Sequence, residues 1–141
     1  DAYFAAFPNV QAYMDRTVAE AKTRGYTETL FGRRRRIPEL ENANFRIRQA
    51  GERQAMNAAI QGLAADIFKI ALIRIDAALT EANLASRLVL QVHDEVIVEA
   101  PHVEKDQVEK LVLEIMQNAT ALDVPLAVNS AWGATWAEAK S

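Results

Sequence analysis

The sequence predicts an α+β fold in which helices pack on a small antiparallel sheet. Two long segments before residue 84 carry apolar residues at helical spacing, and two short runs of β-branched and aliphatic residues follow near residue 90. Another amphipathic helix pattern comes after them. Half of the 141 residues are apolar, which is enough to bury one core, so we expect a single globular domain. No stretch approaches the roughly 18 to 20 uncharged apolar residues of a membrane span, so we expect no membrane partner.

The first part of the chain predicts a helix, a short strand and a loop. Proline suits the first turn of a helix over Pro8–Arg24, and Gly25 supplies its C-terminal stop. Tyr26–Leu30 is short and rich in Thr and Tyr, which predicts a strand. Residues 33–44 have no apolar periodicity and include Pro38, so we expect a loop there.

The rest of the chain predicts a long helix, a hairpin, another helix and a last strand. Asn44–Asn83 keeps a helical apolar pattern throughout. Leu88–Val92 and Val96–Val98 are separated by only a few residues, which predicts a β-hairpin. Val103–Thr120 is a clear amphipathic helix pattern. Leu126–Trp132 alternates apolar and polar or small residues, which predicts a strand.

Composition and charge narrow the possible chemistry. The absence of cysteine excludes disulfides, thiolate zinc sites and cysteine nucleophiles, and it suits a reducing cytoplasm. The net charge of -3 hides an asymmetry, because residues 22–53 hold 9 basic and 4 acidic side chains and residues 95–141 hold 3 basic and 8 acidic ones. One surface would therefore attract polyanions. The alternative is two differently charged solvated surfaces, and charge alone favours it.

The turn of the predicted hairpin is unusual. Tight hairpins prefer Gly or Asn at the turn, but this one has His93, Asp94 and Glu95. Carboxylates on a rigid support are typical ligands of Mg²⁺, although an isolated acidic turn is more often only solvated. Adjacent residues on a strand point to opposite faces, so a two-metal site needs another carboxylate. Asp66 and Asp76 lie on the long helix away from its polar stripe, and neither is assigned.

Other hydrolytic chemistries lack their motifs. The helical H-E-x-x-H pattern of zinc hydrolases is absent, and His102 lies nine residues beyond His93. The G-x-S-x-G turn of serine hydrolases and the glycine loops that bind phosphate are also absent.

A polar stripe runs along the long helix. Arg53, Asn57 and Gln61 recur at i, i+4 and i+8, and all three side chains donate hydrogen bonds. Every Watson–Crick pair presents acceptors at similar places in the minor groove, so such a row can hold any correct duplex and loses contacts at a mispair. The alternative is a surface stripe or an internal polar network, which the stripe alone would favour.

These motifs resemble those of family A DNA polymerases, the bacterial DNA polymerase I type. Glu52–Ile67 (ERQAMNAAIQGLAADI) resembles the long palm helix of that family, and Leu90–Glu95 (LQVHDE) is similar to its third polymerase motif. Gly25–Leu30 (GYTETL), Gly32–Arg35 (GRRR) and Gly133–Trp136 (GATW) are also similar. The similarity runs in order over nearly the whole chain.

The resemblance implies a role for each site residue. Asp94 would be catalytic as a metal ligand, Glu95 would assist at the metal site or the primer end, and His93 would approach the primer terminus. The chemistry would be attack of a primer 3′-hydroxyl on a nucleotide α-phosphate, with Mg²⁺ in a two-metal site. The residues that would bind the primer-template duplex are Arg53, Asn57 and Gln61.

The resemblance also implies an architecture, partners and a location. We expect a palm-type antiparallel sheet with a central hairpin, packed against long α-helices. Residues 1–48 would form the fingers-to-palm connection and residues 49–141 the palm, together an incomplete polymerase domain. The partners would be primer-template DNA, deoxynucleoside triphosphates and the remainder of the polymerase domain, in the bacterial cytoplasm and associated with the nucleoid.

The chain departs from the family pattern in two ways. Ala59 stands where Pro is frequent, Leu63 where Ser or Thr is frequent, and Arg36 where an aromatic residue is common, which leaves the subgroup open. The Asp-Tyr-Ser-x-x-Glu strand and the nucleotide-binding helix Arg-x-x-x-Lys-x-x-x-Phe-x-x-x-Tyr-Gly have no counterpart. We therefore expect the C-terminal part of a polymerase domain, inactive by itself. The run Arg33–Arg36 would contact DNA phosphate or form a solvated loop.

Two other interpretations remain open from the sequence. One is a non-catalytic DNA-binding or assembly module that retains the palm fold. The other is a helix-rich interaction domain without a nucleic-acid role.

Overall fold

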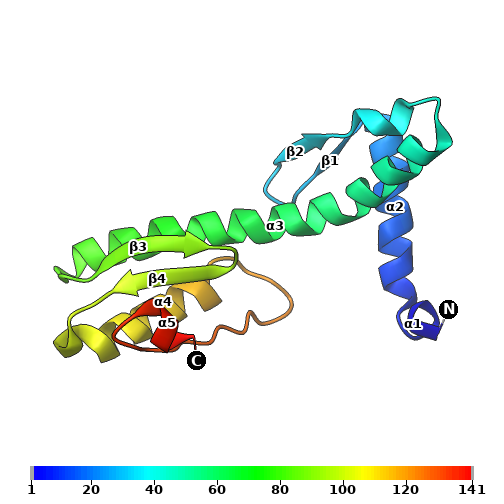
Figure 1. The fold of residues 1–141 in the computed structure, drawn as a ribbon. Helices are drawn as coiled ribbons and strands as arrows, with labels where there is room; N and C mark the ends of the chain where they lie inside the picture. The colour runs from blue at the N-terminus through cyan, green and yellow to red at the C-terminus, as the bar shows by residue number, and fades with distance from the viewer. Residues whose placement is uncertain (1, 141) are drawn as a thin grey trace. The chain divides into compact units, whose positions relative to one another are not determined.

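The computed structural model describes residues 2–140, and the chain divides into two compact units, residues 1–66 and 67–141. The long helix α3 (Phe45–Glu81) begins in the first unit and ends in the second (Figure 1). Helices and two small antiparallel hairpins confirm the predicted α+β class. The predicted division into a connection and a palm remains a prediction.

The first unit opens with two helices, α1 (Ala2–Ala6) and α2 (Pro8–Arg24). The bounds of α2 are those predicted, because local sequence determines both ends. Pro8 occupies the first turn, where its missing N–H costs no hydrogen bond. Gly25 takes a left-handed conformation with φ 77° and donates its N–H to the Ala21 carbonyl at 2.7 Å, which ends the helix.

The segment after α2 forms a hairpin where a loop was predicted. β1 (Tyr26–Glu28) pairs antiparallel with β2 (Arg34–Arg36), and the 3-10 helix η1 (Pro38–Glu41) follows. The prediction of a loop over residues 33–44 is therefore wrong in its first part. Four consecutive arginines lack the apolar alternation of a strand, and only the pairing with β1 defines this one.

A small core holds the first unit together. Its buried residues come from α2, the chain after β2, η1 and α3, and Val18 packs against them; they are Ala21, Ile37, Leu40 and Ala55. The small side chains of α3 let neighbouring backbone approach closely. A Cβ at Gly51 would lie 3.0 Å from Glu39 Cβ and 3.1 Å from the Leu40 nitrogen, so η1 packs directly on this helix.

The second unit contains the predicted hairpin and amphipathic helix. β3 (Arg87–Val92) pairs antiparallel with β4 (Glu95–Glu99), and the 3-10 helix η2 (His102–Glu104) leads into α4 (Lys105–Gln117). A buried cluster joins the end of α3 to α4 and the hairpin. Figure 1 shows these elements beside one another. Its fully or nearly fully buried residues are Ile75, Leu79 and Val108.

The predicted strand over Leu126–Trp132 is wrong. Residues 118–135 of the described chain contain no strand, and the short helix α5 (Trp136–Ala139) follows them. The alternation is partly real, since Leu126, Val128 and Trp132 are half-buried while Ala127, Asn129 and Ala131 are exposed. Alternation reports burial of one side of an extended chain, whereas a strand also needs a partner for its backbone hydrogen bonds.

No helix among the described residues is both long and apolar enough to cross a membrane.

Candidate functional site

The turn between β3 and β4 places three of the predicted site residues together in the second unit. Val92 pairs with Glu95, so His93 and Asp94 form a two-residue turn. His93 has φ 52°, and Gln91 donates its side-chain amide to the His93 carbonyl at 3.0 Å. The left-handed conformation costs a non-glycine residue about 1 to 2 kcal/mol. Such strain tends to persist where a specific side chain is needed at the turn.

The two carboxylates of this turn have different surroundings. Both side chains are exposed, and Glu95 Oε2 lies 3.4 Å from Lys140 Nζ. Lys140 Nζ also lies 4.9 Å from the centroid of the Trp136 ring. Asp94 makes no ion pair or side-chain hydrogen bond within the described residues. The turn therefore offers one carboxylate without a partner in the described part of the chain and one that already has a cationic neighbour.

A divalent cation would find only part of a binding site in this chain. No group of three or more His, Asp and Glu side chains among residues 2–140 is arranged to hold a metal ion. Mg²⁺ commonly takes one or two protein carboxylates and completes its coordination with water and phosphate oxygens. The exposed Asp94 carboxylate fits that role, and further protein ligands would have to come from elsewhere.

The predicted polar stripe lies on an exposed face of α3 in the first unit. Arg53, Asn57 and Gln61 are all exposed, and Ala55 and Ala59 lie buried on the other side of the helix. At 100° per residue the stripe drifts by about 80° over about 12 Å of helix. The structure thus brings the three donors onto one surface. The stripe and the β3–β4 turn belong to different compact units.

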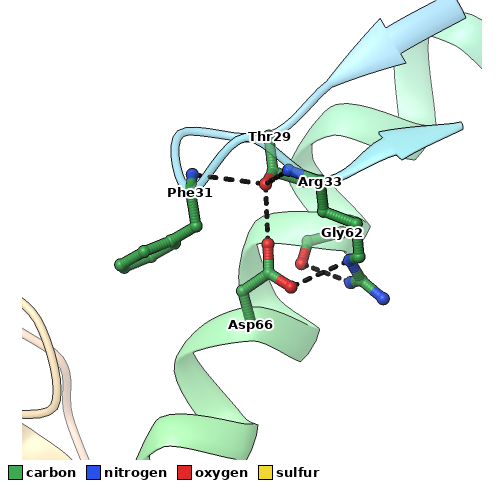
Figure 2. A network of polar contacts seen from close by, with 5 residues as sticks. All are labelled: Thr29, Phe31, Arg33, Gly62 and Asp66. Carbon is green, nitrogen blue, oxygen red and sulfur yellow. Dashed lines mark hydrogen bonds and ion pairs between the residues drawn. The ribbon is translucent and has the colours of Figure 1, made fainter.

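A polar network that the sequence did not indicate secures the β1–β2 turn to α3 (Figure 2). The Asp66 carboxylate accepts a hydrogen bond from Thr29 Oγ1 at 2.6 Å and forms an ion pair with Arg33 Nε at 2.8 Å. Arg33 Nη2 donates to the Gly62 carbonyl at 2.8 Å. Thr29 Oγ1 in turn accepts from the backbone N–H groups of Phe31 and Arg33. We call these contacts of Thr29, Arg33, Gly62 and Asp66 the turn clamp.

The turn clamp also accounts for one of the two carboxylates that the sequence left unassigned. Both oxygens of Asp66 have protein partners, and its side chain is only 11% exposed, so it has no free coordination site for a cation. Asp76 lies exposed on α3 in the second unit.

The arginines in and just before β2 have different interaction partners. Arg33 is part of the turn clamp, and Arg35 Nη2 donates to Gln54 Oε1 at 3.5 Å. Arg34 pairs with Glu28 and lies 4.8 Å from the centroid of the Tyr26 ring. The hydrogen bond to Glu28 raises the pKa of Arg34 above its ordinary value, with a smaller effect of charge from Tyr26. Most of the run is a strand and not a solvated loop, and its contact with DNA phosphate stays a prediction.

The family model and the individual relatives that this chain matches agree with one another. The sequence model of the family described as DNA polymerase family A matches residues 1–138. DNA polymerase I of Bacillus subtilis is 55% identical over 140 residues, which are 99% of this chain and 16% of that protein. DNA polymerase I of Mycobacterium bovis is 52% identical over 136 residues, or 96% of this chain and 15% of that protein. The chain therefore spans about a sixth of the length of these curated relatives.

A solved structure has the same fold. It is described as the POL domain of Pol1 from M. smegmatis in complex with DNA primer-template and dNTP. The TM-score is 0.95 at 47% identity, over 99% of this chain and 24% of that chain.

Proposed function

Because this chain belongs to DNA polymerase family A, we propose that it forms part of the palm of a DNA-directed DNA polymerase. The observation that carries the proposal is the β3–β4 turn, where the strained His93 precedes Asp94, whose carboxylate has no partner among residues 2–140. The similar polymerase domain from M. smegmatis was solved with primer-template DNA and a nucleotide, which supports these as the partners of the whole polymerase. The relatives are DNA polymerases I of bacteria, which supports a bacterial protein.

At the turn, Asp94 would hold Mg²⁺, and Glu95 would assist from the adjacent position. Bound Mg²⁺ would lower the pKa of the primer 3′-hydroxyl and stabilise charge on the leaving oxygen. His93 would lie toward the primer terminus on the same turn. The chain supplies only part of a two-metal site, so the isolated chain is inactive in nucleotidyl transfer.

On α3, Arg53, Asn57 and Gln61 would hold the primer-template duplex. Their donors match the acceptors that every Watson–Crick pair presents in the minor groove. The contact is independent of sequence and sensitive to pairing, as a templated enzyme requires. Residues 1–48 would connect the fingers to a palm formed by residues 49–141.

The catalytic role is tested by Asp94→Asn in the complete polymerase. Loss of several kcal/mol of metal-dependent stabilisation predicts primer extension roughly a thousandfold slower. Asp123→Asn is the matched control, because Asp123 is also exposed in a loop and makes no ion pair among the described residues. If Asp94→Asn extends primers at the unaltered rate, the catalytic proposal is wrong and a non-catalytic module is supported.

The binding role has its own readout. Fluorescence anisotropy of labelled primer-template DNA, titrated over a salt series, measures affinity without chemistry. We expect Arg53→Ala to weaken binding and reduce the salt dependence, because the variant releases fewer counterions. Arg16→Ala is the matched control, since Arg16 is an exposed arginine on α2 outside the stripe. Equal affinities for the two variants would remove Arg53 from the duplex-binding surface.

A further inference from the structure

The turn clamp is a more strongly built contact than surface polar pairs usually are. The side chain of Asp66 is 11% exposed, and each of its oxygens has a different partner on the β1–β2 turn (Figure 2). Arg33 contacts Asp66 and the Gly62 carbonyl through two of its nitrogens, which fixes the orientation of the guanidinium. Thr29 Oγ1 donates to Asp66 and accepts from backbone N–H groups of its own turn. The turn and the helix are therefore held together at several atoms.

The clamp lies behind the part of α3 that carries Gln61. Gly62 and Asp66 lie roughly 100° and 140° around the helix from Gln61, and roughly 140° and 180° from Asn57, so they face away from the stripe. The turn approaches the helix closely at this point, because a Cβ on Gly62 would lie only 2.6 Å from Thr29 Cγ2. Gln61 is the neighbour of Gly62 in sequence. Its backbone is thus supported from behind while its side chain remains exposed.

The part of α3 that carries Arg53 is held by other contacts. It is about 12 Å along the helix from Gln61. The contacts there are the buried core that includes Ala55, the ion pair of Lys22 and Glu52 at 2.6 Å, and the long 3.5 Å hydrogen bond from Arg35 to Gln54, none of which involves the turn clamp. A disturbance of the clamp should therefore affect Gln61 more than Arg53.

We infer that Thr29, Arg33 and Asp66 are positioning residues for Gln61, and through it for discrimination against mispaired primer ends. This inference rests on the proposed function. A hydrogen bond from Gln61 to a minor-groove acceptor tolerates only a few tenths of an ångström of displacement before it weakens. A mispair shifts the acceptor, and a rigid donor cannot follow it. A donor on a loosened helix turn can follow the shifted acceptor of a mispair. Loss of the turn clamp therefore lowers discrimination against mispaired primer ends more than it lowers extension of matched ends.

The test compares extension of matched and mismatched primer ends by the complete polymerase carrying Thr29→Val. Valine keeps the shape of threonine and removes the hydroxyl that donates to Asp66. We expect the ratio of matched to mismatched kcat/KM to fall about threefold to tenfold, which corresponds to about 0.7 to 1.4 kcal/mol. Thr23→Val is the matched control, since the Thr23 hydroxyl donates to the Ala19 carbonyl of its own helix and to no other described residue. Thr29→Ser keeps the hydroxyl and is expected to keep the discrimination.

The double variant with Gln61→Ala separates positioning from general loss of structure. If the clamp acts through Gln61, Thr29→Val lowers discrimination no further once Gln61 is alanine. Full additivity of the two effects, or equal behaviour of Thr29→Val and Thr23→Val, overturns this inference and leaves the proposed function untouched. If Gln61→Ala itself leaves discrimination unchanged, the assigned duplex contact of Gln61 fails as well. Catalysis by Asp94 is judged separately by Asp94→Asn.

Discussion

Gly62→Ala provides a test of the turn clamp in which two effects of opposite sign compete. Alanine is more favourable than glycine inside a helix by about 0.8 to 1 kcal/mol. The new methyl group, however, would lie 2.6 Å from Thr29 Cγ2, whereas carbon atoms in contact normally sit about 3.5 to 4.0 Å apart. Thr29 would have to retreat by about 1 Å. That retreat breaks its 2.6 Å hydrogen bond to Asp66.

The broken hydrogen bond should outweigh the gain in helix propensity. A hydrogen bond to a charged group contributes about 1.5 to 3 kcal/mol when it is well shielded, and this one is part-buried. Subtracting the propensity gain, we expect Gly62→Ala to lower the free energy of unfolding by about 0.5 to 2 kcal/mol. Urea unfolding followed by circular dichroism would report this as a lower midpoint at an unchanged slope.

The Thr29→Ser background reverses the expected sign. Serine lacks the Cγ2 methyl group with which the methyl group introduced by Gly62→Ala would collide, and it keeps the hydroxyl that donates to Asp66. In that background Gly62→Ala should raise stability by up to about 1 kcal/mol. The reasoning is refuted if Gly62→Ala stabilises the otherwise unchanged chain, or if it destabilises the Thr29→Ser chain to the same extent.

Two further predictions concern the second unit. Lys140→Met should lower the free energy of unfolding by less than about 1 kcal/mol, because both members of its ion pair with Glu95 are half-exposed. In a Glu95→Gln background the loss should be smaller, because only the contact of Lys140 with the Trp136 ring is then removed. Additivity of the two changes would show that the ion pair does not form. The pKa of Glu104 is lowered below its ordinary value of 4.5 by hydrogen bonds, chiefly from the Ser86 hydroxyl and then from the Ala85 N–H. Its stabilising effect is therefore present above pH 4.5 and is lost as the pH falls through the lowered pKa. Glu104→Gln should unfold at a lower midpoint than the unchanged chain at neutral pH, with the difference shrinking on acidification; a constant difference at all pH values would contradict this.

The elements that depend on nearby residues were predictable from the sequence. Pro8 and Gly25 mark both ends of α2, and each acts within one helical turn. The β3–β4 hairpin was predictable because its strands are neighbours in sequence and both are apolar. β2 was not, because an arginine-rich strand is recognisable only by its partner β1. The strand predicted over 126–132 failed because burial on one side does not create a pairing edge.

The candidate site, too, was predictable from the sequence only where it depends on neighbouring residues. The unusual β3–β4 turn was visible in the sequence, since a tight turn without Gly or Asn points to a residue such as His93 at positive φ. The turn clamp was not visible, because Thr29 and Asp66 are 37 residues apart and neither belongs to a recognisable spacing. Many sequences contain a basic residue after a threonine-rich strand and an aspartate on a later alanine-rich helix. That combination is too common to predict a contact such as the one between Arg33 and Asp66.

The surroundings of the two turn carboxylates argue for unequal roles. Asp94 is the second residue of the two-residue turn and Glu95 is the first residue of β4, so the two carboxylates sit on differently shaped backbone. Lys140 lies beside Glu95, and moving that carboxylate to a metal would also remove the partner of the ammonium group. Asp94 has no such competing contact among the described residues. On the proposed function, Asp94→Asn should therefore be far more damaging to extension than Glu95→Gln. No group of three or more carboxylate or histidine side chains among residues 2–140 could complete the coordination of a metal at Asp94. We therefore expect the chain by itself to bind primer-template DNA without extending the primer.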